Sequence, residues 1–282
     1  MKKKICLFMI GILILSSLMV ACGKENQANV KNDKNENSKV ESYTLEGVKN
    51  KGKLVMGTCA DYPPFEFHKM IDGKDQIVGF DIEIGKYIAD ELGVELEIKD
   101  MDFDKLLGGL STGMLDIVIA GMNPSPEREK EANFSDIYYE STHSVLIRKE
   151  DESKYTSIDD VSGKSIGVQI GTLQEEMAKT LVGDGEIVSL NTNPDIVMNL
   201  KTNKIDCAIM ETPVAESFAK ANDDLMLAEG LTIENKSGGV AIAIKKGNDE
   251  LTEKINEILT KAKSEGLLDK WMVEATELSD SE

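Results

Sequence analysis

Hydrophobic and polar positions in residues 45–274 follow two periods that succeed one another along the chain. The run KLVMGT at 53–58 is short and continuously apolar, which is typical of a buried strand. In 79–93, five residues recur at helical spacing and a glycine follows as a stop signal; they are Phe80, Ile84, Tyr87, Ile88 and Leu92. This part of the chain is therefore predicted to pass from a strand into a helix.

The same alternation continues toward the C-terminus and predicts the order of the elements. Strands are expected at 53–58, 94–101, 115–121, 164–169, 186–190, 206–210 and 238–246. Helices are expected at 79–93, 103–113, 172–181, 194–204, 213–221 and within 248–272. Repeated strand–helix alternation predicts an α/β fold with parallel sheets.

Four polar blocks fall at the predicted ends of strands. They are GTCADYPPF at 57–65, AGMNPSPER at 120–128, QIGTLQ at 169–174 and IMETP at 209–213. In α/β sheets of this kind, ligands bind at the carboxyl ends of the strands. The four blocks together predict a ligand-binding cleft.

The block at 120–128 ends in a single arginine at the start of a predicted helix. Ser125 is expected to be the N-cap and Pro126 the first helical residue, which places Arg128 in the first turn. A cation there opposes the helix dipole, so the arrangement favours a bound anion such as a carboxylate. The alternative is an ion pair between Arg128 and Glu127 or Glu131.

A second candidate, Glu211, follows the apolar strand at 206–210. A carboxylate at a buried strand end needs a cationic partner, which here is either a protein side chain or a ligand ammonium group. Alternatively, Glu211 is an acid at the start of the helix that Pro213 opens. Arg128 and Glu211 in different halves of the chain would together clamp an α-amino acid by hinge closure.

Aromatic residues follow the first two predicted strands, in DYPPFEF at 61–67 and MDFDKLL at 101–107. Tyr62 and Phe103 are expected to form walls of the cleft around the aliphatic part of a small ligand. Phe65 and Phe67 are more typical of the core.

The N-terminus carries an export signal rather than part of the fold. Three lysines precede an apolar stretch at 5–20, followed by LMVAC, which resembles a bacterial lipobox. The resemblance implies cleavage of a signal peptide at 1–21 and a lipid on Cys22. An uncleaved signal anchor is the alternative. Residues 22–44 are poor in large apolar residues and are interpreted as a flexible tether.

Composition and cysteine usage narrow the function classes further. The formal net charge of −19 makes a nucleic-acid partner unfavourable. Cys59 and Cys207 lie in apolar strand-like stretches and are interpreted as buried free thiols, with a disulfide as the alternative in an exported protein. His68 and His143 stand apart from any cysteine cluster, so neither a metal site nor a cofactor is expected.

Five blocks of the sequence resemble the extracytoplasmic solute-binding proteins of polar amino acid ABC transporters. They are GTCADYPPFEF, VGFDIEIGKYIADELG, the long block from MDFDKLL to IYYES, IGVQIGTLQEE and DCAIMETPVAES. The resemblance spans about 45–274. It implies a two-lobed, type II periplasmic-binding-protein-like fold with two crossovers: lobe 1 at 45–139 and 240–274, lobe 2 at 142–236, and a tail at 275–282. It also implies a non-enzymatic, lipid-anchored, monomeric receptor outside the cytoplasm that delivers an amino acid to permease subunits.

The resemblance also implies a role for individual residues. Arg128 would hold the ligand α-carboxylate, helped by Gly121 and Asn123 and by the amides of Gly171 and Thr172. Glu211 would take the α-ammonium group. Tyr62 and Phe103 would form the walls, with Ala120 and Cys59 also in the cleft.

Three positions depart from the pattern of this family. Cys59 and Glu211 stand where Asp is common, and Asn123 stands where Ser or Thr is common. Because Asp61 and Glu66 lie near Cys59, the ligand side chain is expected to be polar and neutral or basic. An amino acid sensor is the alternative function. An enzyme on the same scaffold is a further one, although neither histidine lies in a strand-end block.

Overall fold

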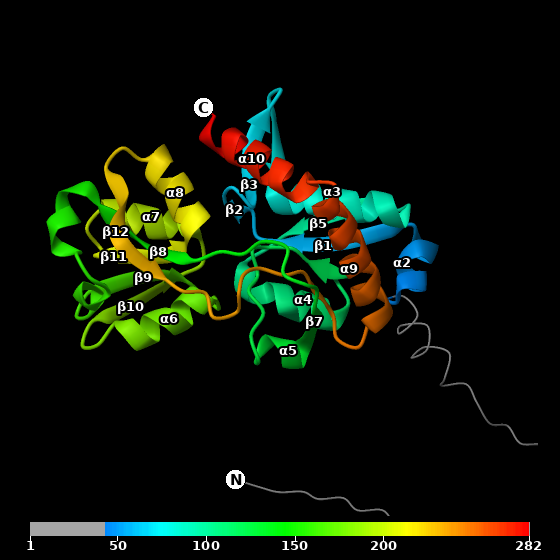
Figure 1. Cartoon of the computed structure of the whole chain (residues 1–282), viewed down its shortest axis with the longest axis horizontal. Coiled ribbons are helices and arrows are strands. Elements are labelled where there is room, and N and C mark those ends of the chain that lie inside the picture. Colours follow the sequence, from blue (N-terminus) through cyan, green and yellow to red (C-terminus); the bar gives the residue numbers. More distant parts are fainter. Residues whose placement is uncertain (1–42, 282) are drawn as a thin grey trace, which may run out of the picture.

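Two five-stranded sheets, one in each of two lobes, organise the fold (Figure 1). The computed structural model describes residues 43–281. The signal peptide, the lipidated Cys22 and nearly all of the tether predicted above lie outside the described residues. Lobe 1 contains both described termini, and lobe 2 is formed by the middle of the chain (Figure 1).

The first sheet has the order β5-β1-β6-β13-β7 and is flanked by helices. Its strands are β1 (Lys53–Thr58), β5 (Glu95–Asp100), β6 (Ile117–Val118), β7 (Ala132–Phe134) and β13 (Ala243–Lys245). The helices of lobe 1 are α2 (Leu45–Lys51), α3 (Phe80–Leu92), η1 (Phe103–Lys105), α4 (Leu106–Thr112), α5 (Arg128–Glu131), α9 (Asp249–Ser264) and α10 (Leu267–Asp280). A small sheet of β2 (Asp61–Tyr62), β3 (Glu66–Ile71) and β4 (Lys74–Val78) projects from the lobe (Figure 1).

The second sheet has the order β10-β9-β11-β8-β12. Its strands are β8 (His143–Arg148), β9 (Ser165–Gln169), β10 (Glu186–Leu190), β11 (Cys207–Glu211) and β12 (Leu225–Ile233). The helices of lobe 2 are η2 (Lys149–Lys154), η3 (Ile158–Val161), α6 (Leu173–Leu181), α7 (Asn193–Lys201) and α8 (Thr212–Ala221). The α/β, two-lobed fold class predicted from the sequence is confirmed.

The prediction of purely parallel sheets was wrong, because both sheets are mixed. β1 is parallel to β5 and β6, and β9 is parallel to β10 and β11. The antiparallel strands β8, β12 and β13 adjoin the connections between the lobes, where the chain enters or leaves a sheet. A strand that arrives from the other lobe has no crossover helix to reverse its direction.

The C-terminal tail predicted at 275–282 is also corrected. Helix α10 continues to Asp280, and Ala275 is buried within it. The end of α10 reaches lobe 2, where Asp280 pairs with Lys220 and Ser279 lies beside Ser217 of α8. These contacts keep the last two turns in a helix.

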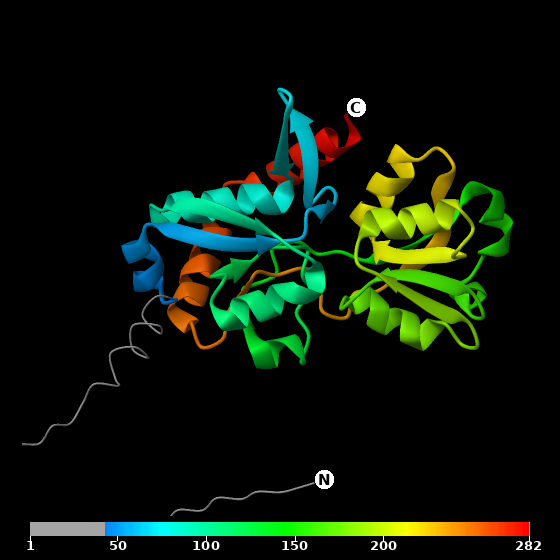
Figure 2. The same cartoon turned by 180° about the vertical axis from the view of Figure 1, so that it is seen from behind.

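The two connections between the lobes run side by side (Figure 1 and Figure 2). They join β7 to β8 and β12 to β13, and a single antiparallel bridge pairs Tyr139 with Val240. Two adjacent extended segments of this kind form a hinge. In residues 43–281, no helix is long and apolar enough to cross a membrane.

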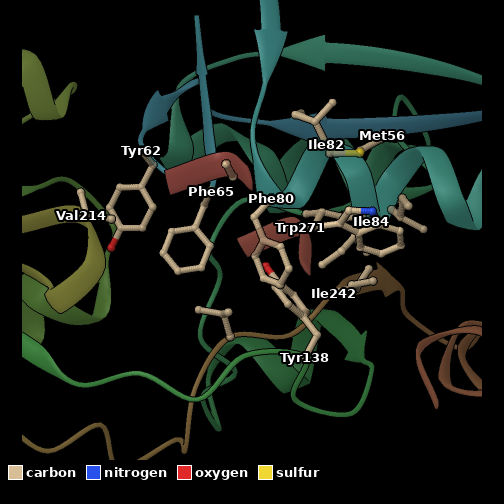
Figure 3. Close-up of a cluster of buried hydrophobic side chains, with 14 of the residues drawn as sticks. Met56, Tyr62, Phe65, Phe80, Ile82, Ile84, Tyr138, Val214, Ile242 and Trp271 are labelled. Carbon is tan, nitrogen blue, oxygen red and sulfur yellow. The ribbon is translucent and has the colours of Figure 1, made fainter. Parts of the chain in front are cut away.

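The largest hydrophobic core begins in lobe 1 and continues across the boundary into lobe 2, where it includes Leu146, Ile196 and Val214. Phe65 and Phe80 are fully buried, which confirms Phe65 as a core residue; their ring centroids lie 6.1 Å apart. Tyr62 stacks on Phe65 at 5.8 Å and extends toward Val214 of α8 (Figure 3). The core of lobe 1 thus ends in an aromatic wall that faces lobe 2.

Candidate functional site

A small cavity lies between the lobes at the carboxyl ends of β1 and β9. Its lining combines residues from the β1–β2 region, from 120–123 and from the β9–α6 turn. The residues are Cys59, Asp61, Tyr62, Glu66, Phe103, Ala120, Gly121, Asn123, Gln169, Thr172, Leu173 and Gln174. Seven of the residues predicted to bind a ligand are in this list. Arg128 and Glu211 are not in this list, but each is hydrogen-bonded to Asn123 of the lining.

Arg128 reaches across the cleft from the first residue of α5, which begins two residues later than the helix start predicted at Pro126. The Ser125 Oγ accepts a hydrogen bond from the Arg128 N–H at 3.3 Å, and its carbonyl oxygen accepts one from Glu129. The guanidinium donates from Nη1 to the Asn123 carbonyl at 2.6 Å and from Nη2 to the Gly171 carbonyl at 2.8 Å. Burial lowers its pKa to about 10, which still leaves it charged at neutral pH.

The surroundings of the guanidinium suit an anion. It lies 5.2 Å from the centroid of the Phe103 ring. Among the described residues it forms no ion pair, so the predicted alternative of a pair with Glu127 or Glu131 is not observed. Because only two of its five N–H groups are used by carbonyl oxygens, Arg128 can still offer a two-pronged site to a carboxylate.

Glu211 ends β11 with its side chain fully buried. It occupies the N-cap position of α8, but its carboxylate makes no capping hydrogen bond, so the alternative role as a helix acid is not observed. Three neutral groups donate to it instead: Tyr62 Oη at 3.3 Å, Asn123 Nδ2 at 2.9 Å and Ser141 Oγ at 2.7 Å. Burial raises its pKa to about 7. A cation brought to this carboxylate would favour its ionised form.

Asp61 lines the cavity and links the two lobes. Its carboxylate accepts hydrogen bonds from Gln169 Nε2 at 3.1 Å, the Asn193 N–H at 3.0 Å and Asn193 Nδ2 at 3.1 Å. All of these donors belong to lobe 2 and are neutral. Burial raises the pKa of Asp61, and the hydrogen bonds from Asn193 and Gln169 oppose that rise.

Glu66 and Asp81 are two further buried acidic residues near the cavity. Both side chains are fully buried. Asp81, in the first turn of α3, accepts from the Gly121 N–H at 2.8 Å and from Tyr138 Oη at 2.9 Å. Neither carboxylate oxygen of Glu66 has a hydrogen-bond donor. Burial raises the pKa of Glu66 well above its usual range.

Two backbone positions predicted to bind the ligand have defined roles in this structure. Gly121 has a φ of 53°, and a side chain there would meet the Tyr62 ring at 2.8 Å, so only glycine fits. The Gly171 N–H donates to Glu175 Oε2 at 2.9 Å, which differs from the prediction that this amide faces the cavity. Glu175 takes it because its carboxylate folds back over the N-terminus of α6. Thr172 caps α6 and lines the cavity.

The two described cysteines are free and buried, so the disulfide alternative is not observed. Cys59 Sγ lies 3.6 Å from Asp61 Oδ1 within the cavity wall. Burial and the nearby carboxylate raise its pKa far above the usual range, and burial raises that of Cys207 to about 12. Both thiols are therefore protonated and poorly nucleophilic. Residues 43–281 contain no cluster of ligands suited to a metal ion.

The sequence analysis missed several polar groups of the site. They are Gln169, Gln174 and Asn193 of lobe 2, Ser141 of the first connection, and Asp81 of α3. Gln169 and Gln174 lie within the strand-end block QIGTLQ, which was the available signal. Amide side chains carry no chemistry that distinguishes a site from a surface, so spacing alone did not identify them.

Comparison with known proteins decides the family. Residues 54–274 match the model of the bacterial extracellular solute-binding proteins, family 3. The chain belongs to this family. The arginine-binding extracellular protein ArtP of Bacillus subtilis is 41% identical over 225 residues, 78% of this chain and 84% of ArtP.

Two further relatives of this solute-binding protein show the range of the family. The L-cystine-binding protein TcyJ of Escherichia coli is 31% identical over 240 residues, 82% of this chain and 88% of TcyJ. The crystal structure of the substrate-binding protein AbpA of Streptococcus pneumoniae, bound to L-arginine, is 40% identical with a TM-score of 0.81. That match covers 84% of this chain and all of AbpA. These relatives are binding proteins of amino acid transport.

Proposed function

We propose that this solute-binding protein is the receptor of an ABC importer and that it binds L-arginine between its lobes. Family membership supports amino acid binding for import. Two relatives at about 40% identity are named or titled for arginine. The ligand itself is inferred from the charges that surround the cavity.

Arg128 and Glu211 carry charges opposite to those of the carboxylate and the ammonium group that every α-amino acid has. The carboxylate is held by the guanidinium of Arg128, with the backbone at Gly121, Gly171 and Thr172 nearby. The ammonium group is held by Glu211, which Asn123, Tyr62 and Ser141 already orient. The two contacts join the lobes and favour closure on the ligand.

The single observation that supports a cationic side chain is Glu66. Its carboxyl lines the cavity, is fully buried and has no donor on either oxygen. A buried carboxylate without a partner is costly, and a guanidinium supplies two parallel N–H donors. Asp61, which also lines the cavity, adds a second acidic side chain to it. Glutamine would supply neither the charge nor the second N–H pair.

The remaining lining residues suit the aliphatic part of the ligand. Tyr62 and Phe103 form two walls, and Ala120 and Cys59 contribute small apolar surface. Cys59 stands where a carboxylate is common in the family, and Asp61 and Glu66 provide the negative charge in its place.

The cellular setting follows from the N-terminus. Cleavage after residue 21 and a lipid on Cys22 hold the monomeric receptor on the outer side of the cytoplasmic membrane. The closed, loaded form is then delivered to permease subunits. Loss of arginine uptake on deletion of the gene, restored by the wild-type gene, tests transport against the alternative of sensing.

Ligand identity is tested by a thermal-shift screen of the twenty amino acids. The protein is expressed without residues 1–22, the predicted signal peptide and lipidated cysteine. Arginine is expected to give the largest shift, and a ligand at 100 times its Kd adds about 2.7 kcal/mol to the free energy of unfolding. A neutral or acidic amino acid as the strongest ligand would refute the arginine assignment. Cystine, the ligand named for TcyJ, is included for comparison.

A further inference from the structure

The carboxylate of Asp61 in lobe 1 lies at the N-terminus of α7 in lobe 2. Its Oδ2 accepts a hydrogen bond from the Asn193 N–H at 3.0 Å, and its Oδ1 accepts one from Asn193 Nδ2 at 3.1 Å. These two hydrogen bonds form the Asp61–α7 contact. Each oxygen of a lobe 1 carboxylate is thus bound by the first residue of a lobe 2 helix.

The first turn of α7 leaves one amide for this contact. Thr192 is the N-cap, and its Oγ1 accepts from the Asp195 N–H at 3.2 Å. The Thr192 carbonyl accepts from the Ile196 N–H, and Pro194 has no N–H. Within residues 193–196, the Asn193 amide is therefore the group that needs an acceptor from outside the helix. A carboxylate is favoured there by the helix dipole as well.

The Asn193 side chain is held by lobe 2 in the orientation that the contact needs. It is 2% exposed, and its Nδ2 lies 3.2 Å from Gln169 Oε1. Gln169 is fixed in turn, because its Nε2 donates to the Asn191 carbonyl at 3.0 Å. Asp61 and Gln169 line the cavity, whereas Asn193 is not among the lining residues. A change at Asn193 therefore reports on the contact between the lobes rather than on a contact with a ligand.

We propose that Asn193 is a positioning residue for lobe closure, which stabilises the closed form equally for every amino acid that the protein binds. Asp61 and Asn193 belong to different lobes, so the Asp61–α7 contact forms only when the hinge brings the lobes together. Both are groups of the protein, so the contribution of the contact to closure does not depend on the ligand side chain. The inference rests on amino acid binding between the lobes, but not on arginine as the ligand.

The consequence for affinity follows from the closed fraction. The apparent dissociation constant of any ligand is inversely proportional to the fraction of protein in the binding-competent form. Loss of the Asp61–α7 contact lowers that fraction. It should therefore weaken all ligands by one common factor, whereas loss of a side-chain contact would weaken only the ligands that make it.

Asn193→Asp separates this role from attraction of the ligand by charge. In the closed form the new carboxylate faces that of Asp61, and like charges repel. In the open form an Asp in the first turn of α7 is favourable, so lobe 2 itself is not weakened. A direct effect of the added negative charge on a cationic ligand would have the opposite sign, because it would strengthen the binding of arginine.

The test is isothermal titration calorimetry with L-arginine and with L-glutamine, the latter injected at high concentration, on the protein without residues 1–22. At pH 8 the introduced carboxyl group is ionised. Asn193→Asp is expected to weaken both ligands by the same factor, about tenfold or more, since it replaces a hydrogen bond to a charged group by repulsion. Unchanged affinities, tighter arginine binding, or a loss confined to arginine would overturn the proposal.

The matched control is Asn199→Asp, which makes the same change on the same helix. The Asn199 amide donates within α7, to the Asp195 carbonyl at 2.7 Å, and both affinities should stay at the wild-type value. Circular dichroism and melting temperature establish that each variant is folded. If L-arginine does not bind the wild type, the proposed ligand fails. The comparison of Asn193→Asp with Asn199→Asp is then made with the two strongest amino acids of the thermal-shift screen and still decides this inference.

An exchange of the two side chains provides a second readout, which a purely structural role of Asn193 would not produce. In the double variant Asp61→Asn with Asn193→Asp, the amide and the carboxylate change lobes. The new amide oxygen in lobe 1 can still accept from the N–H of residue 193, and its N–H groups can donate to the new carboxylate. L-glutamine binding is expected to recover most of the affinity that Asn193→Asp alone loses. No recovery in a folded double variant would contradict the proposal.

Discussion

Asn123 donates from Nδ2 to Oε1 of Glu211 at 2.9 Å and so joins the strand-end loop of lobe 1 to the strand end of lobe 2. The same amide donates to the Gly239 carbonyl at 3.0 Å, in the second connection between the lobes. Both residues depart from the pattern of the resembled family, in which Ser or Thr and Asp are common. The structure shows that these two residues, Asn123 and Glu211, are in contact. The longer amide and the longer carboxylate meet across the cleft.

This contact predicts that the two departures are coupled. Asn123→Ser and Glu211→Asp should each weaken arginine binding by about 1–3 kcal/mol, because each removes a hydrogen bond to a buried charge. The double variant is expected to lose less than the sum, with a coupling energy of about 0.5–3 kcal/mol. Calorimetric dissociation constants for the four proteins complete the cycle. Strict additivity would show that the contact has no role in binding.

Arg128 is predicted to contribute most of the carboxylate binding energy. Arg128→Ala should weaken arginine binding by about 3–5 kcal/mol, since the ligand carboxylate would be buried without a charged partner. Lys105→Ala, which removes an exposed lysine paired with Asp102 on the same lobe, is the control and should leave affinity unchanged. Affinity of Arg128→Ala equal to that of the wild type would remove Arg128 from the proposed site.

Tyr62 is predicted to act through its hydroxyl as well as its ring. The hydroxyl donates to Glu211 and accepts from Gln174 Nε2 at 3.1 Å, both in lobe 2. Tyr62→Phe keeps the ring stacked on Phe65 but should weaken arginine binding by about 0.5–1.5 kcal/mol per lost hydrogen bond. Tyr87→Phe is a suitable comparison, because its hydroxyl is exposed and lies 3.4 Å from Glu265. A loss of the same size in both variants would show that the effect is not specific to the cleft.

Some residues of this site could be predicted from the sequence and others could not, and the difference lies in the chemistry of each residue. Arg128 was found because a cation in the first turn of a helix opposes the helix dipole. Glu211 was found because a carboxylate at the end of a buried strand usually has a cationic partner. Asp81 was not found, since an acid in the first turn of α3 has an ordinary explanation in the helix dipole. The Gly171 amide was predicted to be open but is covered by Glu175, four residues later. Contacts of that kind depend on side-chain directions that spacing does not determine.

The same limit applies to the fold. The extent of β1 and of α3 followed from apolar periodicity. The antiparallel strands β8 and β12 did not, because their pairing is set by how the chain crosses between the lobes. The helical end of α10 was missed because its support, Lys220 and Ser217, comes from the other lobe.

The buried acids predict how the stability of the ligand-free protein depends on pH. The pKa of Glu211 is raised to about 7 from an ordinary value of 4.5. Between these values the folded protein holds a proton that the unfolded chain has lost. The free energy of unfolding from this group is therefore fully present below about pH 4.5 and is lost as pH rises toward 7. Asp81, with a pKa of about 6, acts in the same direction.

His143 acts in the opposite direction and must be separated from Glu211. It is buried, its pKa is lowered to about 4, and its contribution to stability therefore rises between pH 4 and its ordinary value of 6.5. Comparison of the wild type with Glu211→Gln cancels His143, because both proteins contain it. The wild type should lose about 3 kcal/mol relative to Glu211→Gln between pH 4.5 and 7, at about 1.4 kcal/mol per pKa unit. Urea unfolding at a series of pH values measures this difference, and a difference that stays constant with pH would mean that Glu211 is ionised throughout.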